Sequence, residues 1–357
     1  MSAVRNKRVL SLNLHGLGDF VISLPVLSEL ARAGCGPITG LVWPALQEVA
    51  ACVPALDRVV PLPRDRENEP ELSAFVREVA GDRGFDLLLD FSFQPRAGRI
   101  AAAVAAPRTV GFGIDQQEHP CYTDSIPNLD RELRLHRNLR IPGLLGLKAP
   151  GRPDFPVRVP EASARRVESL LASSGVDLAH SRPVAVHPGS GVRRRNWPPE
   201  RFAALADRIA VHTGEPVLLL GGRGRTYDGT DESEVAAGVE AAMSGSPVNL
   251  AGMLTLPELV CLLARCSLFV GNNSGPAHLA CSVAGVPCLL VWAPRNERLW
   301  MPYGAPVELV VAETHCSRDC LLNKCEDIQY CLARIGPDEV FERYLKTLAP
   351  AAAGGRA

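Results

Sequence analysis

Short apolar segments alternate with amphipathic ones along most of the chain, and this alternation predicts a series of strands and helices. RVLSLNL at 8–14 and FDLLLDF at 85–91 are two of the apolar segments, and an amphipathic stretch runs from Asp19 to Ala33. The predicted strands are apolar throughout, so both faces of their sheet must be covered by helices. The pattern therefore predicts an α/β protein with parallel sheets.

The expected elements fall into two series. In the first we expect strands at 8–14, 37–43, 56–62, 85–91 and 109–113, and helices at 19–33, 71–83 and 96–106. In the second we expect strands at 183–189, 216–221, 248–252, 268–273 and 287–293, and helices at 198–212, 232–243, 256–266 and 276–285.

A proline-rich stretch separates the two series. Residues 148–161 carry four prolines and neither helical nor strand periodicity, which is typical of a linker. We predict an N-terminal domain at 1–155, a C-terminal domain at 156–335, and a final helix and tail at 336–357 that can pack back on the N-terminal domain. Two doubly wound domains place the loops after their strands beside an interdomain cleft, where we expect the function.

Composition and charge narrow the class of protein. Hydrophobic residues make up 46% and charged residues 22%, which is ordinary for a globular chain. Lys plus Arg is 38 against 39 Asp plus Glu, so no global basic field exists to bind nucleic acid. No apolar run approaches the ~18 residues that a membrane span needs. We expect a cytoplasmic protein with at most peripheral membrane contact.

The first candidate site is the loop HGLGD at 15–19, between the first strand and its helix. Gly16 and Gly18 permit a tight turn that a ligand can approach, and Asp19 is expected at the helix N-cap. Asp19 either only caps the helix or acts as a general base that takes a proton from an attacking hydroxyl. The spacing is not the GxGxxG dinucleotide signature.

The second candidate site is VHPGSGVRRRNWPPERF at 186–202, where a strand ends and a basic loop leads into a helix. Ser190 offers a hydroxyl, and the arginines at 193–195 offer guanidinium groups beside flexible glycine amides. Such groups just after a parallel strand suit a diphosphate. The alternative is a solvated basic loop anchored by Trp197.

The third candidate site is GNNSGPAHLACSVAGVP at 271–287, where a strand runs into a helix that we expect from about Pro276. The amides and positive dipole end of that helix form an anion site, to which Ser274 can also donate. His278 contacts either a ligand or a neighbouring loop. Two anion sites at strand ends of one domain indicate a nucleoside diphosphate.

Taken in order, GLGDFVISLPVLSEL and the second and third segments resemble glycosyltransferase family 9, the heptosyltransferases of lipopolysaccharide core assembly. The resemblance runs from Val9 to about Val340 and includes the terminal pattern H-C-x3-C-x4-C-x5-C followed by IGPDEV. It implies a GT-B fold, with two Rossmann-like doubly wound domains facing an interdomain cleft. It also implies an ADP-heptose donor, inversion at the anomeric carbon and no required cofactor or catalytic metal.

The resemblance also implies roles for single residues. Asp19 matches the family's catalytic Asp, which deprotonates the acceptor hydroxyl. Arg195 matches a Lys or Arg that faces the donor diphosphate. Ser274, Gly275 and His278 match the phosphate-binding turn and helix start.

Other positions match more loosely or depart from the family. Acidic residues after LLLGGRG, Asp228 or Asp231, lie where the family binds the adenosine ribose, and we predict Asp231 and Ser190 as donor-binding residues. Asn273 stands where the family usually has Asp, although its amide can still bond sugar hydroxyls. His15 lies in a loop where polar or basic residues are more usual. This change leaves the acceptor open between lipopolysaccharide core and a small natural product.

The segment FSFQPRAGR at 91–99 follows a strand of the acceptor half. Gln94 and Arg96 are predicted, with His15, to lie on the acceptor side, and the alternative is a solvated helix start.

Eleven cysteines stand out in the composition, and four of them are clustered. Seven lie scattered through apolar segments, where a cysteine behaves as a small hydrophobe. The clustered residues are candidates for a structural zinc site or an iron–sulfur cluster, and disulfides are the alternative that the cytoplasm disfavours. They are Cys316, Cys320, Cys325 and Cys331.

The leading prediction is an inverting glycosyltransferase that moves a heptose or related sugar from an ADP-sugar to an acceptor hydroxyl or amine. Its partners are the nucleotide-sugar donor and a sugar or small-molecule acceptor. The alternative is a non-catalytic sugar-nucleotide-binding protein. A third interpretation, a metal-dependent redox protein built on the cysteine tail, predicts visible absorbance or stoichiometric iron.

Overall fold

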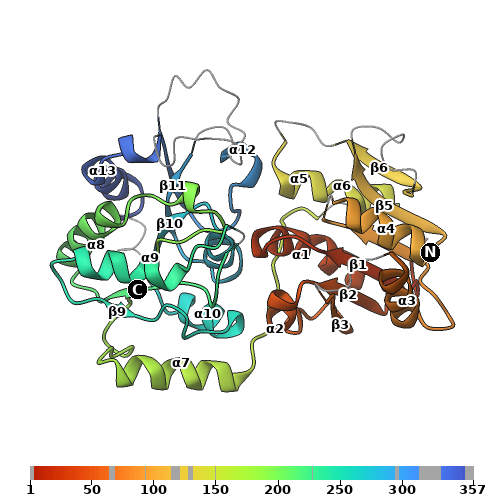
Figure 1. Ribbon diagram of the computed structural model, residues 1–357, viewed down its shortest axis with the longest axis horizontal. Coiled ribbons are helices and arrows are strands. Elements are labelled where there is room, and N and C mark those ends of the chain that lie inside the picture. Colours follow the sequence, from red (N-terminus) through yellow and green to blue (C-terminus); the bar gives the residue numbers. More distant parts are fainter. Residues whose placement is uncertain are drawn as a thin grey trace. The chain divides into compact units, whose positions relative to one another are not determined.

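The computed structural model of the chain (Figure 1) describes residues 4–63, 69–92, 94–113, 121–127, 132–148, 150–226, 228–293, 297–312 and 331–349. The contacts between Cα atoms divide the chain into two compact units, Met1–Arg158 and Val159–Ala357. Each unit is built on one six-stranded parallel sheet. The predicted α/β, doubly wound fold class is confirmed.

The sheet of the first unit has the strand order β3-β2-β1-β4-β5-β6. Its strands are β1 (Val9–Asn13), β2 (Ile38–Val42), β3 (Arg58–Pro61), β4 (Leu87–Asp90), β5 (Arg108–Gly113) and β6 (Asp124–Pro127). In the register, Val9 of β1 lies between Ile38 of β2 and Leu87 of β4. Its helices are α1 (Leu17–Arg32), α2 (Gln47–Ala50), α3 (Glu69–Ala80), α4 (Pro95–Val104), α5 (Arg134–Asn138) and α6 (Arg140–Leu144), with a 3₁₀ helix at Pro44–Leu46.

The first unit buries alternate residues of its strands under two neighbouring helices. Leu10 and Leu12 of β1 and Leu88 of β4 share a core with apolar residues of α3 and α4. Helix α1 instead packs with α5 and α6. One hydrogen bond of this packing, from the Asn138 side chain to the Ile22 carbonyl, lies in the first half of α1.

The sheet of the second unit has the order β12-β11-β10-β7-β8-β9. Its strands are β7 (Val184–His187), β8 (Val217–Leu219), β9 (Val248–Asn249), β10 (Leu268–Asn272), β11 (Cys288–Trp292) and β12 (Val307–Val311). Its helices are α7 (Glu161–Ser173), α8 (Pro199–Thr213), α9 (Glu232–Ala242), α10 (Leu256–Leu263), α11 (Gly275–His278), α12 (Glu297–Trp300) and α13 (Pro337–Thr347). Two 3₁₀ helices span Arg193–Arg195 and Leu332–Arg334, and a π-helix spans Leu279–Val283.

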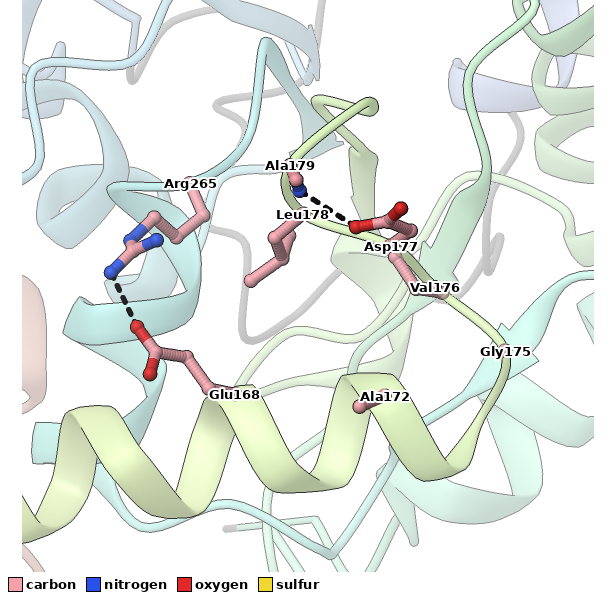
Figure 2. A pocket seen from close by; sticks show the side chains of 8 residues that line it. All are labelled: Glu168, Ala172, Gly175, Val176, Asp177, Leu178, Ala179 and Arg265. Atoms are coloured by element: carbon pink, nitrogen blue, oxygen red, sulfur yellow. Dashed lines mark hydrogen bonds and ion pairs between the residues drawn. The ribbon is translucent and has the colours of Figure 1, made fainter.

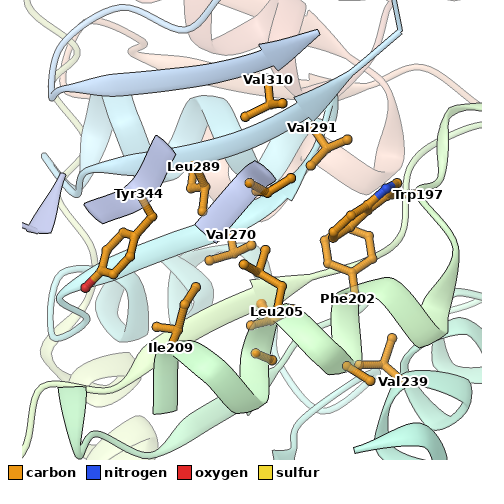
Figure 3. Close-up of a cluster of buried hydrophobic side chains, with 14 of the residues drawn as sticks. Trp197, Phe202, Leu205, Ile209, Val239, Val270, Leu289, Val291, Val310 and Tyr344 are labelled. Carbon is orange, nitrogen blue, oxygen red and sulfur yellow. The ribbon is translucent and has the colours of Figure 1, made fainter. Parts of the chain in front are cut away.

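One face of the second sheet carries a core of large apolar side chains (Figure 3). Trp197 and Phe202 meet edge to face with ring centroids 5.0 Å apart, and both are fully buried. Val270 and Leu289 contribute from β10 and β11. Tyr344 of α13 also packs in this core, although we expected that the final helix can return to the N-terminal domain. Helix α13 contacts α8 and β12 of its own unit.

The strand orders fix where a ligand can approach each sheet. Both orders are that of a Rossmann fold, and the chain reverses direction across the sheet between β1 and β4 and between β7 and β10. In open α/β sheets, ligands bind outside the carboxyl ends of the strands at such a switch point. The loops after these four strands carry most of the predicted site residues, while Asp231 follows β8 and the four clustered cysteines follow β12.

None of the helices in the described part of the chain combines the length and apolar character needed to cross a bilayer.

Candidate functional site

Asp19 lies in the first turn of α1, directly after the switch-point strand β1. The expected N-cap position is wrong: Gly16 is the N-cap and Asp19 is the third residue of the helix. Gly16 has extended backbone angles there, so the N-cap lies three residues earlier than we expected. A carboxylate in a first turn is favoured by the helix dipole. Asp19 therefore lies inside the first turn of the helix and is not its N-cap.

Burial and nearby charges act in opposite directions on Asp19. Burial raises the pKa of Asp19 above its ordinary value, while nearby His15, Arg137 and Arg134 lower it. A carboxylate whose pKa is raised accepts a proton more readily than an exposed one. Arg134 and Arg137 lie on α5 and were not predicted from the sequence, since nothing in LRLHRNLR distinguishes them from solvated arginines.

The structure brings two of the predicted acceptor-side residues together. Gln94 is the N-cap of α4, after β4, and its Nε2 lies 3.4 Å from Nδ1 and 3.4 Å from Nε2 of His15. Arg96 lies farther along the sheet edge, where its Nη2 donates to the Pro63 carbonyl at 3.1 Å. Its guanidinium also lies over the ring of Trp43, 5.2 Å from the centroid. Arg96 therefore supports the loops after β2 and β3.

A buried carboxyl lies at the carboxyl end of β4. Asp90 is fully buried, and it accepts hydrogen bonds from the Tyr122 hydroxyl at 2.6 Å and the Ser92 amide at 2.7 Å. Burial raises the pKa of Asp90, and these hydrogen bonds oppose the rise. The available signal was the acidic residue next to the end of the apolar run FDLLLDF, but no role was predicted for it.

In the second unit, Ser190 and Arg195 shape the loop after β7. The Ser190 hydroxyl is fully buried and donates to the Val192 carbonyl at 2.7 Å. The backbone amide of Arg195 donates to the same carbonyl at 2.9 Å and ends a short 3₁₀ helix. The amide of Arg193 donates to Asp228 at 2.6 Å. This loop is thus folded by its own hydrogen bonds.

The turn after β10 contains two buried polar atoms without a partner among the described residues. They are Oγ of Ser274 and Nδ1 of His278. Burial lowers the pKa of His278 to about 4, against a backbone hydrogen bond at Trp300. Helix α11 begins at Gly275, one residue before the expected start, with Ser274 as its N-cap and Asn273 half-buried before it.

Glu232, for which no role was predicted from the sequence, lies at the carboxyl end of β7. Asp231 is instead the N-cap of α9 and accepts from the Ser233 amide at 2.9 Å. Glu232 accepts from the Gly222 amide at 2.6 Å, and its Oε2 lies 3.5 Å from Nε2 of His187.

The surroundings of Glu232 keep it ionised. Burial opposes its charge, but His187 and the Gly222 amide outweigh burial and lower the pKa of Glu232 to about 2. Gly189 also touches it, because a Cβ built on Gly189 would lie 2.8 Å from the Glu232 carboxyl carbon. Nδ1 of His187 is a further buried atom with no partner in the described part of the chain.

A separate pocket of the second unit lies away from these residues (Figure 2). It has a volume of about 600 Å³, and Glu168 and Arg265 form an ion pair at 2.6 Å on one side of it. Asp177 and Arg265 come before β7 and β10 respectively, at the amino edge of the sheet. None of the predicted site residues lines this pocket.

The scattered and the clustered cysteines have different outcomes. Six scattered cysteines are buried and Cys121 is half-buried. Of the terminal cluster, Cys316, Cys320 and Cys325 lie outside the described residues, and Cys331 packs against the core of the second unit. Within the described ranges, no group of three or more His, Cys, Asp or Glu side chains is arranged to hold a metal ion. The zinc or iron–sulfur site stays a prediction.

Curated relatives of the chain are lipopolysaccharide heptosyltransferases. Lipopolysaccharide core heptosyltransferase OpsX from Haemophilus influenzae is 21% identical over 83% of this chain and 82% of its own. Lipopolysaccharide heptosyltransferase 3 from Escherichia coli is 31% identical, but this match spans 40% of each chain.

Solved structures with the same fold include members of one glycosyltransferase family. The glycosyltransferase family 9 protein from Veillonella parvula superposes with a TM-score of 0.83 at 22% identity, over 97% of this chain and 98% of the other. E. coli heptosyltransferase WaaC with ADP has a TM-score of 0.68 at 17% identity, over 97% and 99%. The predicted GT-B class, two Rossmann-like α/β domains, is confirmed by this shared fold.

The family model described as glycosyltransferase family 9 (heptosyltransferase) matches residues 77–327, more than half of the chain. The resemblance found in the sequence is thereby confirmed. The chain belongs to glycosyltransferase family 9, the heptosyltransferase family.

Proposed function

We propose that this chain transfers a heptose or a related sugar from an ADP-sugar to an acceptor hydroxyl or amine, with inversion at the anomeric carbon. One observation carries the proposal. In the described residues, Nδ1 of His187, Oγ of Ser274 and Nδ1 of His278 are buried without partners, and all three lie at or just after the ends of β7 and β10. Buried polar atoms are normally satisfied, so a polar ligand is the expected partner.

The donor side of the reaction is assigned to the second unit. We propose that Arg195 and the amides at Ser274 and Gly275 stabilise the diphosphate as it leaves with the bonding electrons of the broken C–O bond. Ser190 shapes this loop, and Asn273 bonds the sugar. Glu232 takes the role that we predicted for Asp231, binding the ribose hydroxyls, because the Asp231 carboxylate caps α9. The relative solved with ADP supports this choice of nucleotide.

The acceptor side is assigned to the first unit. Asp19 accepts the proton of the acceptor hydroxyl while the acceptor oxygen forms the new bond to the anomeric carbon. His15 and Gln94, within 3.4 Å of each other, orient the acceptor, and Arg96 supports the surrounding loops. The curated relatives act on lipopolysaccharide, which makes its core the first acceptor to test and small natural products the second.

Metal independence is part of the proposal, since guanidinium and amide groups supply positive charge to the leaving diphosphate. Full transfer activity in excess EDTA is the expected result, and activity that returns only with a divalent cation would contradict it. A cytoplasmic reaction is also proposed, because the buried side chains of Cys35, Cys266 and Cys288 suit a reducing compartment.

The test begins with a thermal-shift screen of ADP-, GDP- and UDP-sugars, because a bound nucleotide stabilises the folded state by mass action. We expect stabilisation by ADP compounds. Transfer from ADP-heptose is then measured for the wild type and Asp19→Ala, in which transfer should be lost while ADP still binds. Binding without transfer in the wild type would favour the non-catalytic alternative, and full activity of Asp19→Ala would remove Asp19 as the base.

A further inference from the structure

Arg137 is a buried cation on α5, the helix that packs against α1, which carries the proposed catalytic base. It lies on α5 with only 3% of its surface exposed. Its guanidinium carbon lies 3.8 Å from the ring centroid of Phe112, a cation–π contact from β5. A buried charge is costly unless its surroundings compensate it. The cost of burying Arg137 indicates that its charge has a role at this position.

Hydrogen bonds tie this guanidinium to the helix of Asp19. Nε and Nη2 of Arg137 approach the Asn138 side-chain oxygen at 3.3 and 3.1 Å. The Asn138 amide nitrogen in turn donates to the Ile22 carbonyl at 3.2 Å. Ile22 lies one turn after Asp19 in α1. If the Asn138 amide were reversed, its NH₂ group would face the guanidinium of Arg137, which is also a donor. These hydrogen bonds, which form a bridge from Arg137 through Asn138 to Ile22, therefore fix the orientation of the amide.

We propose that Arg137 is a positioning residue that keeps Asp19 ionised and holds α5 in register with α1. The inference rests on the proposed function, in which Asp19 is the base. Asn138 and Phe112 fix the buried guanidinium, and its charge acts on the half-buried Asp19.

The charges around Asp19 show why this cation matters. Burial raises the pKa of Asp19, and His15, Arg137 and Arg134 are the charges that lower it. Burial and Arg134 lower the pKa of Arg137 to about 10, so it is still a cation at neutral pH. Asp90 is a second acidic group that favours the charged form of Arg137.

Neighbouring basic side chains differ from Arg137 in exposure. His136 on α5 and Arg140 at the start of α6 are exposed, and Arg140 pairs with Glu132 at 3.3 Å. Arg134 is half-buried. Solvent screens exposed charges more strongly than buried ones, so Arg137 contributes more per charge than its exposed neighbours. Arg140 therefore provides a matched control of the same charge on an adjoining helix.

The test compares Arg137→Met, Arg137→Lys and Arg140→Met. The pH profile of kcat is measured at saturating donor and acceptor. In Arg137→Met we expect the acidic limb to move upward by roughly 1 pH unit, because an opposite charge was removed from beside the base. Arg137→Lys restores the charge and should bring the limb back toward the wild-type position. Arg140→Met should leave it unchanged.

A second readout does not require transfer. The Asp19 carboxyl is titrated by ¹³C NMR in the same variants, with its signal assigned from Asp19→Asn. A higher pKa of Asp19 in Arg137→Met, reversed in Arg137→Lys, supports the inference. This result would stand even if no ADP-sugar were a donor, an outcome that would contradict only the proposed function. An unmoved titration overturns the inference. If Arg137→Met does not fold, the test uses Arg137→Lys and Asn138→Ala. A folded Asn138→Ala variant with the wild-type titration and pH profile would show that the hydrogen-bonded link through Asn138 does not position Arg137.

Discussion

The side-chain amide of Asn272 donates to the carbonyl of Pro188 at 2.6 Å, joining the end of β10 to the loop after β7. Its oxygen accepts from the Trp197 amide at 2.9 Å, so both ends of this fully buried side chain are used. The two loops that carry the proposed donor site are therefore held at a fixed spacing by one residue.

Asn272→Ala should destabilise the second unit and weaken donor binding together. The substitution leaves a buried carbonyl and a buried N–H without partners, which costs roughly 2–4 kcal/mol. Urea unfolding measures the stability, and calorimetry with ADP measures the affinity. Asn249→Ala, at the half-buried last position of β9, is the control with a smaller expected effect. Equal stability of Asn272→Ala and the wild type would contradict the bridging role.

Gly189→Ala should reduce ADP affinity by displacing Glu232. A Cβ at this position would lie 2.8 Å from the Glu232 carboxyl carbon, closer than side chains approach one another. Because the carboxylate is held by the Gly222 amide, it can yield only by breaking that hydrogen bond. We expect a loss of about tenfold or more in affinity, equivalent to one lost hydrogen bond to a charged group.

The matched control for this change is Gly336→Ala, since a Cβ on Gly336 meets nothing within 4 Å. Its ADP affinity should equal that of the wild type. Unchanged affinity in Gly189→Ala would show that Glu232 does not contribute to donor binding.

The sequence was sufficient to predict the strands whose apolar pattern is strong. All ten predicted strands are present, because a long apolar run between two helical patterns leaves few alternatives. Strands β6 and β12 were missed. Two of the four residues of β6, DSIP, are polar and one is proline, and in the described sheet the strand pairs with β5 alone. Their position therefore depends on the neighbouring strand and not on their own pattern.

The site could be located from the sequence but not resolved to single side chains. Loops after parallel strands identified the segments around Asp19, Ser190 and Ser274. Which of two adjacent acids caps α9 was not decidable, because Asp231 and Glu232 both suit a helix start and only packing against Gly189 separates them. The effect of Arg137 on Asp19 arises from contacts across 118 positions in the chain, which no local pattern reveals.

Asp19→Asn should abolish transfer and yet stabilise the folded protein at neutral pH. Since burial raises the pKa of Asp19, the folded state binds its proton more tightly than the unfolded state. Folding stability therefore falls as pH rises through the folded-state pKa, and the neutral amide removes this loss. Urea unfolding at pH 7 and pH 5 should show a gain for Asp19→Asn that shrinks at the lower pH. A less stable variant at pH 7 would mean that the charged carboxylate is favoured by its surroundings.

His278 should make the stability of the protein fall in mild acid. Its pKa is lowered from 6.5 to about 4 by burial, so between these values the unfolded chain binds a proton that the folded state excludes. Stability is then fully present above pH 6.5 and is lost progressively toward pH 4, by a maximum on the order of 3 kcal/mol. Urea unfolding of the wild type between pH 7.5 and 4.5 should follow this course, and His278→Gln should flatten it. His136→Gln, the same change at an exposed position, should keep the wild-type slope. An identical slope in His278→Gln would show that the folded state does not exclude a proton from this ring.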